Sequence, residues 1–161
     1  MSRALETVIR AQVELYAELI EAIGVKREAI RTARLDDVPS IADHESNIIE
    51  RLRELDEQRT AEAKGLRSRL GIEGNSIGAF AAALPKEEGD RLLSLAAVLR
   101  ESIDNAKRES SIVRAAGETL SMHMAGVMQS VRGVLATAGV YGRQGSLRTG
   151  VATASGLDVS S

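Results

Sequence analysis

The chain has 161 residues, of which 43% are hydrophobic and 2% aromatic, and its 21 basic and 23 acidic residues give a formal net charge of −2. This balance of charges, with no basic stripe, argues against nucleic-acid binding, and the absence of cysteine excludes disulfides and thiolate chemistry. There is no run of about 18 apolar residues and no apolar core of a signal peptide, so we expect no membrane insertion and a cytoplasmic protein.

Two helices are predicted over residues 3–34 and 38–70, because apolar residues recur in both at helical spacing. The row in the first consists of Ile9, Tyr16, Ile23 and Ile30, and the row in the second of Ile41, Ile48, Leu52, Leu55, Leu66 and Leu70. The break between them contains Asp36 and Asp37, either of which is expected to cap the second helix, and Pro39, which a first helical turn tolerates. A short capped break between two helices predicts an αα-hairpin.

A second break begins at Gly71, a residue type that suits the C-terminal cap of a helix. Residues 77–84 are predicted to form a short helix, which Asn75 or Ser76 would cap. Pro85 then opens a helix of about fifty residues, and acidic side chains in its first turns favour this start because they complement the helix dipole.

The long helix, predicted over residues 85–138, has two rows of mostly apolar or small residues that alternate at spacings of four and three, as in the seam of a coiled coil. The first row is Leu92, Leu99, Ala106, Val113, Leu120, Val127 and Val134, and the second is Ala96, Ile103, Ser110, Gly117, Met124, Val131 and Ala138. At about 1.5 Å per residue this helix measures roughly 75–80 Å, whereas each hairpin helix measures about 50 Å. We therefore expect part of its C-terminal half to be available to a partner; the other interpretation is an ordinary bundle core.

The composition changes after Ala138, where glycine, serine, threonine and alanine predominate. This change predicts a flexible polar tail over residues 139–161 and one helical domain over residues 1–138. The predicted fold is all-α: an antiparallel helical hairpin plus one long C-terminal helix, forming a coiled-coil-like three-helix bundle with a flexible tail.

The sequence contains no constellation of residues that indicates catalysis. His44 and His123 are the two histidines, and neither has a second metal ligand three or four residues away. We find neither a glycine-rich phosphate loop nor the context of a serine nucleophile. We therefore expect no catalytic residue, no metal site, no cofactor and no enzymatic activity.

Four short motifs follow one another along the chain. They are Leu35-Asp36-Asp37-Val38 followed by Ile41; Glu45 with Ile48, Ile49 and Leu52; Glu57-Gln58-Arg59; and Tyr141-Gly142-Arg143-Gln144-Gly145 directly after the long helix. Their order, within a hairpin, a glycine-containing break, a long helix and a polar tail, resembles the FlgN-type family of flagellar export chaperones over nearly the whole chain.

The resemblance implies a non-catalytic protein that binds hook–filament junction proteins in the cytosol. It would mask their aggregation-prone C-terminal helical segment and deliver them to the flagellar type III export gate. Methionine suits surfaces that repack around a helix, and the client-binding residues that we predict are Leu120, Met124, Val127, Met128, Val131 and Leu135. Tyr141 matches the tail tyrosine of the family, which implies that it docks to the cytosolic domain of the gate. The other interpretation is that its ring folds back onto the helical bundle.

A homo-oligomeric coiled-coil scaffold is the alternative, from a different class of function. The long helix would then pair with a second copy of itself, and Met124 and Val131 would pack across a two-fold axis. The two functions are not exclusive, because a chaperone can form a homodimer while it has no client.

Overall fold

The computed structural model describes the backbone of residues 1–142 and the side chains of residues 1–133. Its elements, in chain order, are α1 (Arg3–Arg31), the 3-10 helix η1 (Leu35–Asp37), α2 (Val38–Leu70), α3 (Ile77–Ala83) and α4 (Lys86–Gly142). This part of the chain contains no strand, which confirms the predicted all-α class. The chain divides into two compact units, Met1–Ala116 and Gly117–Ser161, and each is described by itself. The predicted domain boundary at residue 138 stays a prediction, and most of the predicted tail lies outside the described residues.

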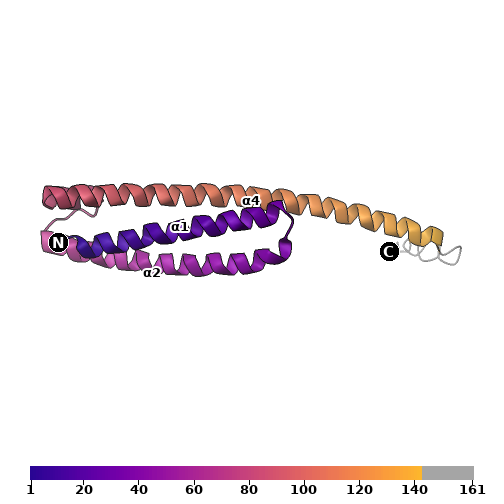
Figure 1. The fold of residues 1–161 in the computed structure, drawn as a ribbon, viewed down its shortest axis with the longest axis horizontal. Coiled ribbons are helices and arrows are strands. Elements are labelled where there is room, and N and C mark those ends of the chain that lie inside the picture. Colours follow the sequence, from indigo (N-terminus) through magenta and orange to yellow (C-terminus); the bar gives the residue numbers. More distant parts are fainter. Residues whose placement is uncertain (143–161) are drawn as a thin grey trace, which may run out of the picture. The chain divides into compact units, whose positions relative to one another are not determined.

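In the first unit, α1 and α2 lie side by side, with η1 at their connection (Figure 1). The start of α1 and the end of α2 belong to the same core cluster, which shows that the two helices run in opposite directions. One core cluster consists of Leu5, Ile9, Leu66, Phe80, Leu84, Leu92 and Leu99. The other consists of Leu15, Leu19, Ala22, Ile23, Ile48, Leu52, Ala106 and Val113. Both clusters include residues of α4, so this part of α4 shares the core of α1 and α2.

The two predicted rows of α4 differ in burial within the first unit. The buried residues of the first row are Leu92, Leu99, Ala106 and Val113. In the second row, Ala96 and Ile103 are only half-buried and Ser110 is exposed. In this unit only the first row is buried, and the described helices leave the second row partly or fully exposed. The two rows therefore do not form a coiled-coil seam within the unit.

Helix α1 ends at Arg31, three residues before the predicted end. Ala33 has a positive φ of 56°, which takes the backbone out of the right-handed helix. The N–H of Arg34 then donates to the carbonyl of Ala29 at 2.8 Å, a hydrogen bond typical of the Schellman motif that ends many helices. Glycine usually occupies this left-handed position, so an alanine there leaves no signal in the sequence.

The predicted cap of α2 by an aspartate side chain is wrong. Asp37 is the N-cap residue, but its backbone is already helical (φ −82°, ψ −21°) and its side chain makes no cap hydrogen bond. An N-cap side chain reaches the next turn from an extended backbone, and the preceding η1 removes that geometry. Asp37 instead accepts a hydrogen bond at its carbonyl from the hydroxyl of Ser40, at 3.1 Å.

The predicted end of α2 and the predicted starts of α3 and α4 agree closely with the structure, whereas the predicted end of α4 does not. Helix α2 covers Val38–Leu70 and ends at Gly71, whose φ of 64° is left-handed. The hydroxyl of Ser76 caps α3 by accepting the Ala79 N–H at 3.1 Å. Pro85 lies just before α4 and accepts the first helical hydrogen bond at its carbonyl, from Gly89 at 2.9 Å. Helix α4 continues to Gly142, four residues beyond the predicted end at residue 138.

Two contacts fix the start of α4. A Cβ added to Gly89 would lie 2.4 Å from the carbonyl oxygen of Ala81, so α3 approaches α4 at a distance that only glycine allows. The carboxylate of Glu88 accepts hydrogen bonds from the N–H and hydroxyl of Ser2, at 3.2 and 3.0 Å, and from the terminal ammonium of Met1, at 3.1 Å. These donors stabilise the ionised carboxylate and lower the pKa of Glu88 to about 2.

None of the helices in the described part of the chain is long and apolar enough to cross a membrane.

Candidate binding surface

The second unit carries a stripe of exposed apolar side chains on α4. Met124, Val127, Met128 and Val131 are between 43% and 51% exposed, and Leu120 is half-buried. Successive residues of an α-helix are about 100° apart, so these five positions fall within an arc of roughly 100°. We call them the Met–Val surface: Leu120, Met124, Val127, Met128 and Val131. Five of the six predicted client-binding residues thus share one helix face.

The remaining predicted residues have side chains outside the described set. Leu135 and Tyr141 belong to α4, but only their backbone is described. Met122 is the most exposed of the large apolar residues, at 77%, and the prediction of client-binding residues leaves it out. Helical spacing agrees with that omission, because Met122 lies about 180° around the helix from Val131.

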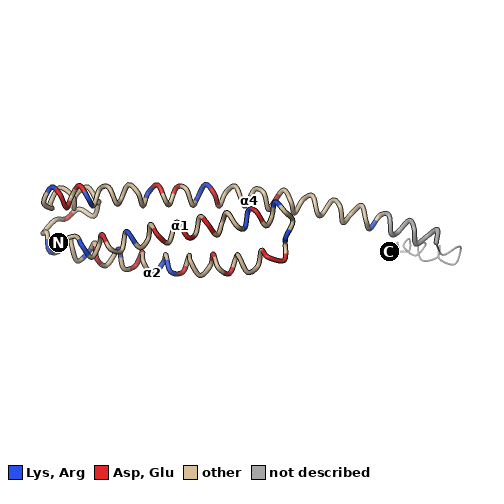
Figure 2. The backbone as a smooth tube through the Cα atoms, in the orientation of Figure 1, with Lys and Arg blue, Asp and Glu red and all other residues tan. Residues whose placement is uncertain are grey.

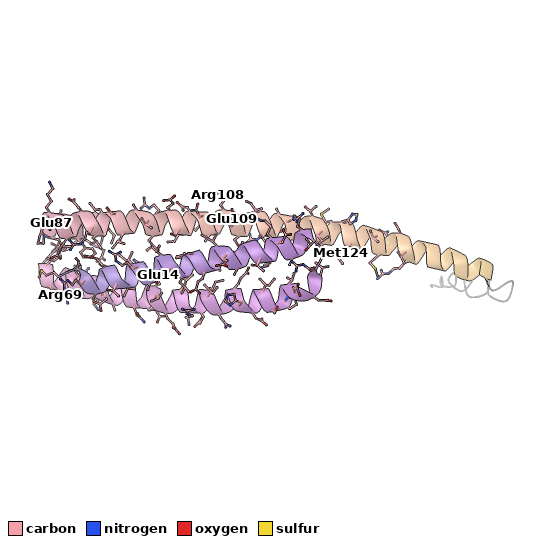
Figure 3. All side chains as sticks on the ribbon, in the orientation of Figure 1. Glu14, Arg69, Glu87, Arg108, Glu109 and Met124 are labelled. Atoms are coloured by element: carbon pink, nitrogen blue, oxygen red, sulfur yellow. The ribbon has the colours of Figure 1, made fainter. Side chains whose placement is uncertain are left out.

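Charge is sparse in this part of α4. Residues 117–133 contain Glu118 and Arg132 as their only acidic and basic residues, and Figure 2 shows the contrast with the charged helices of the first unit. Figure 3 labels Met124 on this segment. A surface with few charges costs little desolvation when an apolar helix binds to it. The stripe is therefore suited to hydrophobic contact with a partner helix.

Glycine weakens this segment as an isolated helix. Gly126 and Gly133 lie in α4 with open space where a Cβ would be, so neither is required by close packing. A glycine inside a helix costs about 1 kcal/mol relative to alanine. Because the two core clusters end at Val113, buried core contacts do not offset this cost. A partner helix that packs on the Met–Val surface would add the missing stabilisation.

The described residues hold no group of three histidine, aspartate or glutamate side chains that could bind a metal ion. His44 and His123 are both exposed, on different helices.

A comparison with models of protein families matches residues 1–149 to the model described as FlgN protein. Searches of curated proteins and of solved structures returned no match.

Proposed function

Because the chain belongs to the FlgN family, a family of flagellar chaperones and not of enzymes, we propose that it is a cytoplasmic export chaperone for hook–filament junction proteins. It binds the C-terminal helical segment of its client and keeps that segment from aggregating. It then delivers the client to the flagellar type III export gate. The arrangement that serves this role is the predicted one, a hairpin of α1 and α2 with one long helix.

The observation that carries the proposal is the exposure of the Met–Val surface. Four large apolar side chains on one face of α4 are each about half exposed, which is unusual unless the surface has a partner. An amphipathic client helix could place its own apolar stripe on them, as helices do in hydrophobic grooves. Methionine side chains adapt to partners of different shape, which suits a chaperone with more than one client.

Tyr141 has a separate role in this proposal. Its backbone is the penultimate residue of α4, and we propose that its ring anchors the chaperone to the cytosolic domain of the export gate. A tyrosine ring buries a large area for the loss of two rotatable angles, so it is an efficient anchor. A Tyr141→Ala variant should keep client binding and lose binding to the gate.

The test of client binding uses two truncations and the C-terminal helical peptide of a junction protein. The chain that ends at residue 142 keeps the Met–Val surface, and it should bind the peptide and melt at a higher temperature when the peptide is added. The chain that ends at residue 119 lacks the surface and should show neither effect. If the shorter chain binds as well as the longer one, the client surface is elsewhere.

The homo-oligomeric scaffold remains the second candidate, because a half-exposed stripe at heptad spacing also suits pairing with a second copy. Light scattering separates the two. A scaffold gives a dimer that persists at low concentration and excludes the client peptide, whereas a chaperone gives a complex with one client, whether or not it dimerises alone.

A further inference from the structure

The first unit contains a groove that the predicted function does not use. Helix α1 forms the floor of the groove with Tyr16 and Leu19. Helix α2 forms one wall with Ile49, and helix α4 forms the other wall with Ile103 and Lys107. Two cavities of about 780 and 470 Å³ form it, and they adjoin because all five of these residues line both. Along α4 the groove reaches from residue 96 to residue 114, which is about 27 Å of helix.

The groove contains the half of the heptad seam that the core leaves uncovered. The second-row residues Ala96, Ile103 and Ser110 all line it. Across from them, on α2, the side chain of Ile49 is 55% exposed. Rows at heptad spacing pack best against another helix, so the shape of the groove and its heptad pattern both suit an additional helix between α2 and α4.

The α4 wall of the groove carries a row of unpaired cations. Arg100, Lys107 and Arg114 line it at intervals of seven residues, and none of them forms an ion pair with another described residue. Asp104 is the acidic residue on this wall, so three cations and one anion give a net charge of +2.

The α2 wall is different, because its charges are already compensated. Arg53 pairs with Glu50 and Glu57, and Arg59 pairs with Asp56. Near the groove's other end, Glu45 pairs with Lys26 of α1 at 3.0 Å. The uncompensated charge therefore lies along one edge only, and it selects an occupant that is acidic along the matching edge.

The chain's own remaining segments do not have that chemistry. Residues 117–161 contain two acidic residues, Glu118 and Asp158, so they cannot present a row of acids at heptad spacing. In a second copy, two helices have such a row: α1 in Glu14, Glu21 and Glu28, and α2 in Asp43, Glu50 and Glu57. The apolar faces of both helices are already buried in their own core. The occupant is therefore a helix of another protein.

We propose that the groove between α2 and α4 binds an amphipathic helix of a partner protein. The apolar stripe of that helix packs on Ile49 and Ile103, and its acidic residues, spaced by seven, pair with Arg100, Lys107 and Arg114. This surface shares no residue with the Met–Val surface, and the inference does not depend on client binding there.

The test uses the full chain and two synthetic helical peptides of 21 residues. Both carry the same leucine and alanine stripe, and they differ in having glutamate or lysine at every seventh position along one edge. We expect the glutamate peptide to bind about tenfold more tightly at low salt, with an advantage that shrinks as salt screens the charges. The double variant Lys107→Glu with Arg114→Glu should reverse this preference.

Three variants make the result specific. Arg108→Glu changes the neighbouring cation of α4, which is exposed but does not line the groove, and should leave the preference unchanged. Ile49→Glu, at an exposed position that folding does not need buried, should abolish binding of the glutamate peptide. Met124→Gln with Val131→Gln should leave that binding intact, because these residues belong to the other surface.

The proposal is overturned if both peptides bind equally, or if Arg108→Glu acts like the double variant. It is also overturned if the Met124 and Val131 changes abolish binding, since the peptide would then occupy the Met–Val surface. A dimer of the chain that disappears in the Lys107 and Arg114 variant would show that a second copy occupies the groove instead.

Discussion

Replacing two residues of the Met–Val surface should weaken client binding without affecting folding. The variant is Met124→Gln with Val131→Gln, and glutamine is chosen because it keeps the side chain long and favours helix. The two native side chains are 43% and 45% exposed. Fully burying such a side chain is worth about 1.5–3 kcal/mol, so burying the exposed part against a client contributes about 1 kcal/mol each. Losing about 2 kcal/mol raises the Kd about 30-fold.

The assay is titration calorimetry with the C-terminal helical peptide of a junction protein, and a melting curve followed by circular dichroism. The matched control is Leu93→Gln with Val98→Gln, which changes two residues of the same helix that are 46% and 45% exposed. The control should leave the Kd unchanged, and neither variant should shift the melting temperature appreciably. The reasoning is refuted if the Kd of the Met124 and Val131 variant stays at the native value, or if the control weakens binding equally.

Three further predictions concern stability. Because the pKa of Glu88 is lowered from 4.5 to about 2, its ionised form stabilises the fold above pH 4.5, and this contribution is lost as the pH falls toward 2. In urea unfolding at a series of pH values, Glu88→Gln should therefore flatten the dependence of stability on pH between 2 and 4.5. An unchanged dependence would contradict the hydrogen bonds assigned to Glu88. Phe80 is 1% exposed, so Phe80→Ala should lower the free energy of unfolding by about 3–5 kcal/mol, and a loss below 1 kcal/mol would show that α3 is not part of the core. Gly24 is a residue of α1 with open space where a Cβ would be, so Gly24→Ala should stabilise the fold by about 0.5–1 kcal/mol and raise the melting temperature. Gly89→Ala places a methyl group against the carbonyl of Ala81 and should lower the melting temperature. If both variants shift the melting temperature in the same direction, the close approach at Gly89 is contradicted.

The candidate surface could be located from the sequence because α4 is a single helix there and its spacing alone decides which residues share a face. Leu120, Met124, Val127, Met128 and Val131 repeat at intervals of three and four, and this places them together whatever surrounds them. The sequence could not tell whether they are core or surface, because a buried stripe and a binding stripe have the same pattern. The exposed fractions in the structure show that Met124, Val127, Met128 and Val131 are not buried in the chain's own core, whereas client binding at these residues stays a prediction.

Local signals predicted the helices well where one residue carries the signal by itself. Gly71 ends α2 and Ser76 caps α3 because a left-handed backbone and a short hydroxyl side chain each act within one turn. The end of α1 was missed because Ala33 adopts the left-handed backbone in place of glycine. The aspartate cap failed because the 3-10 helix before Asp37 changed the backbone from which its side chain starts.

The sequence by itself determined which segments are helical, which residues share a face of each helix, and the order of motifs that points to the FlgN family. Only the tertiary structure decided which face is covered. It buries Leu99 and Ala106 of the first row and leaves Ile103 of the second at the edge of a groove, although both rows have the same apolar period. The physical reason is that periodicity is a property of one helix, whereas burial depends on whether another helix occupies the space beside it.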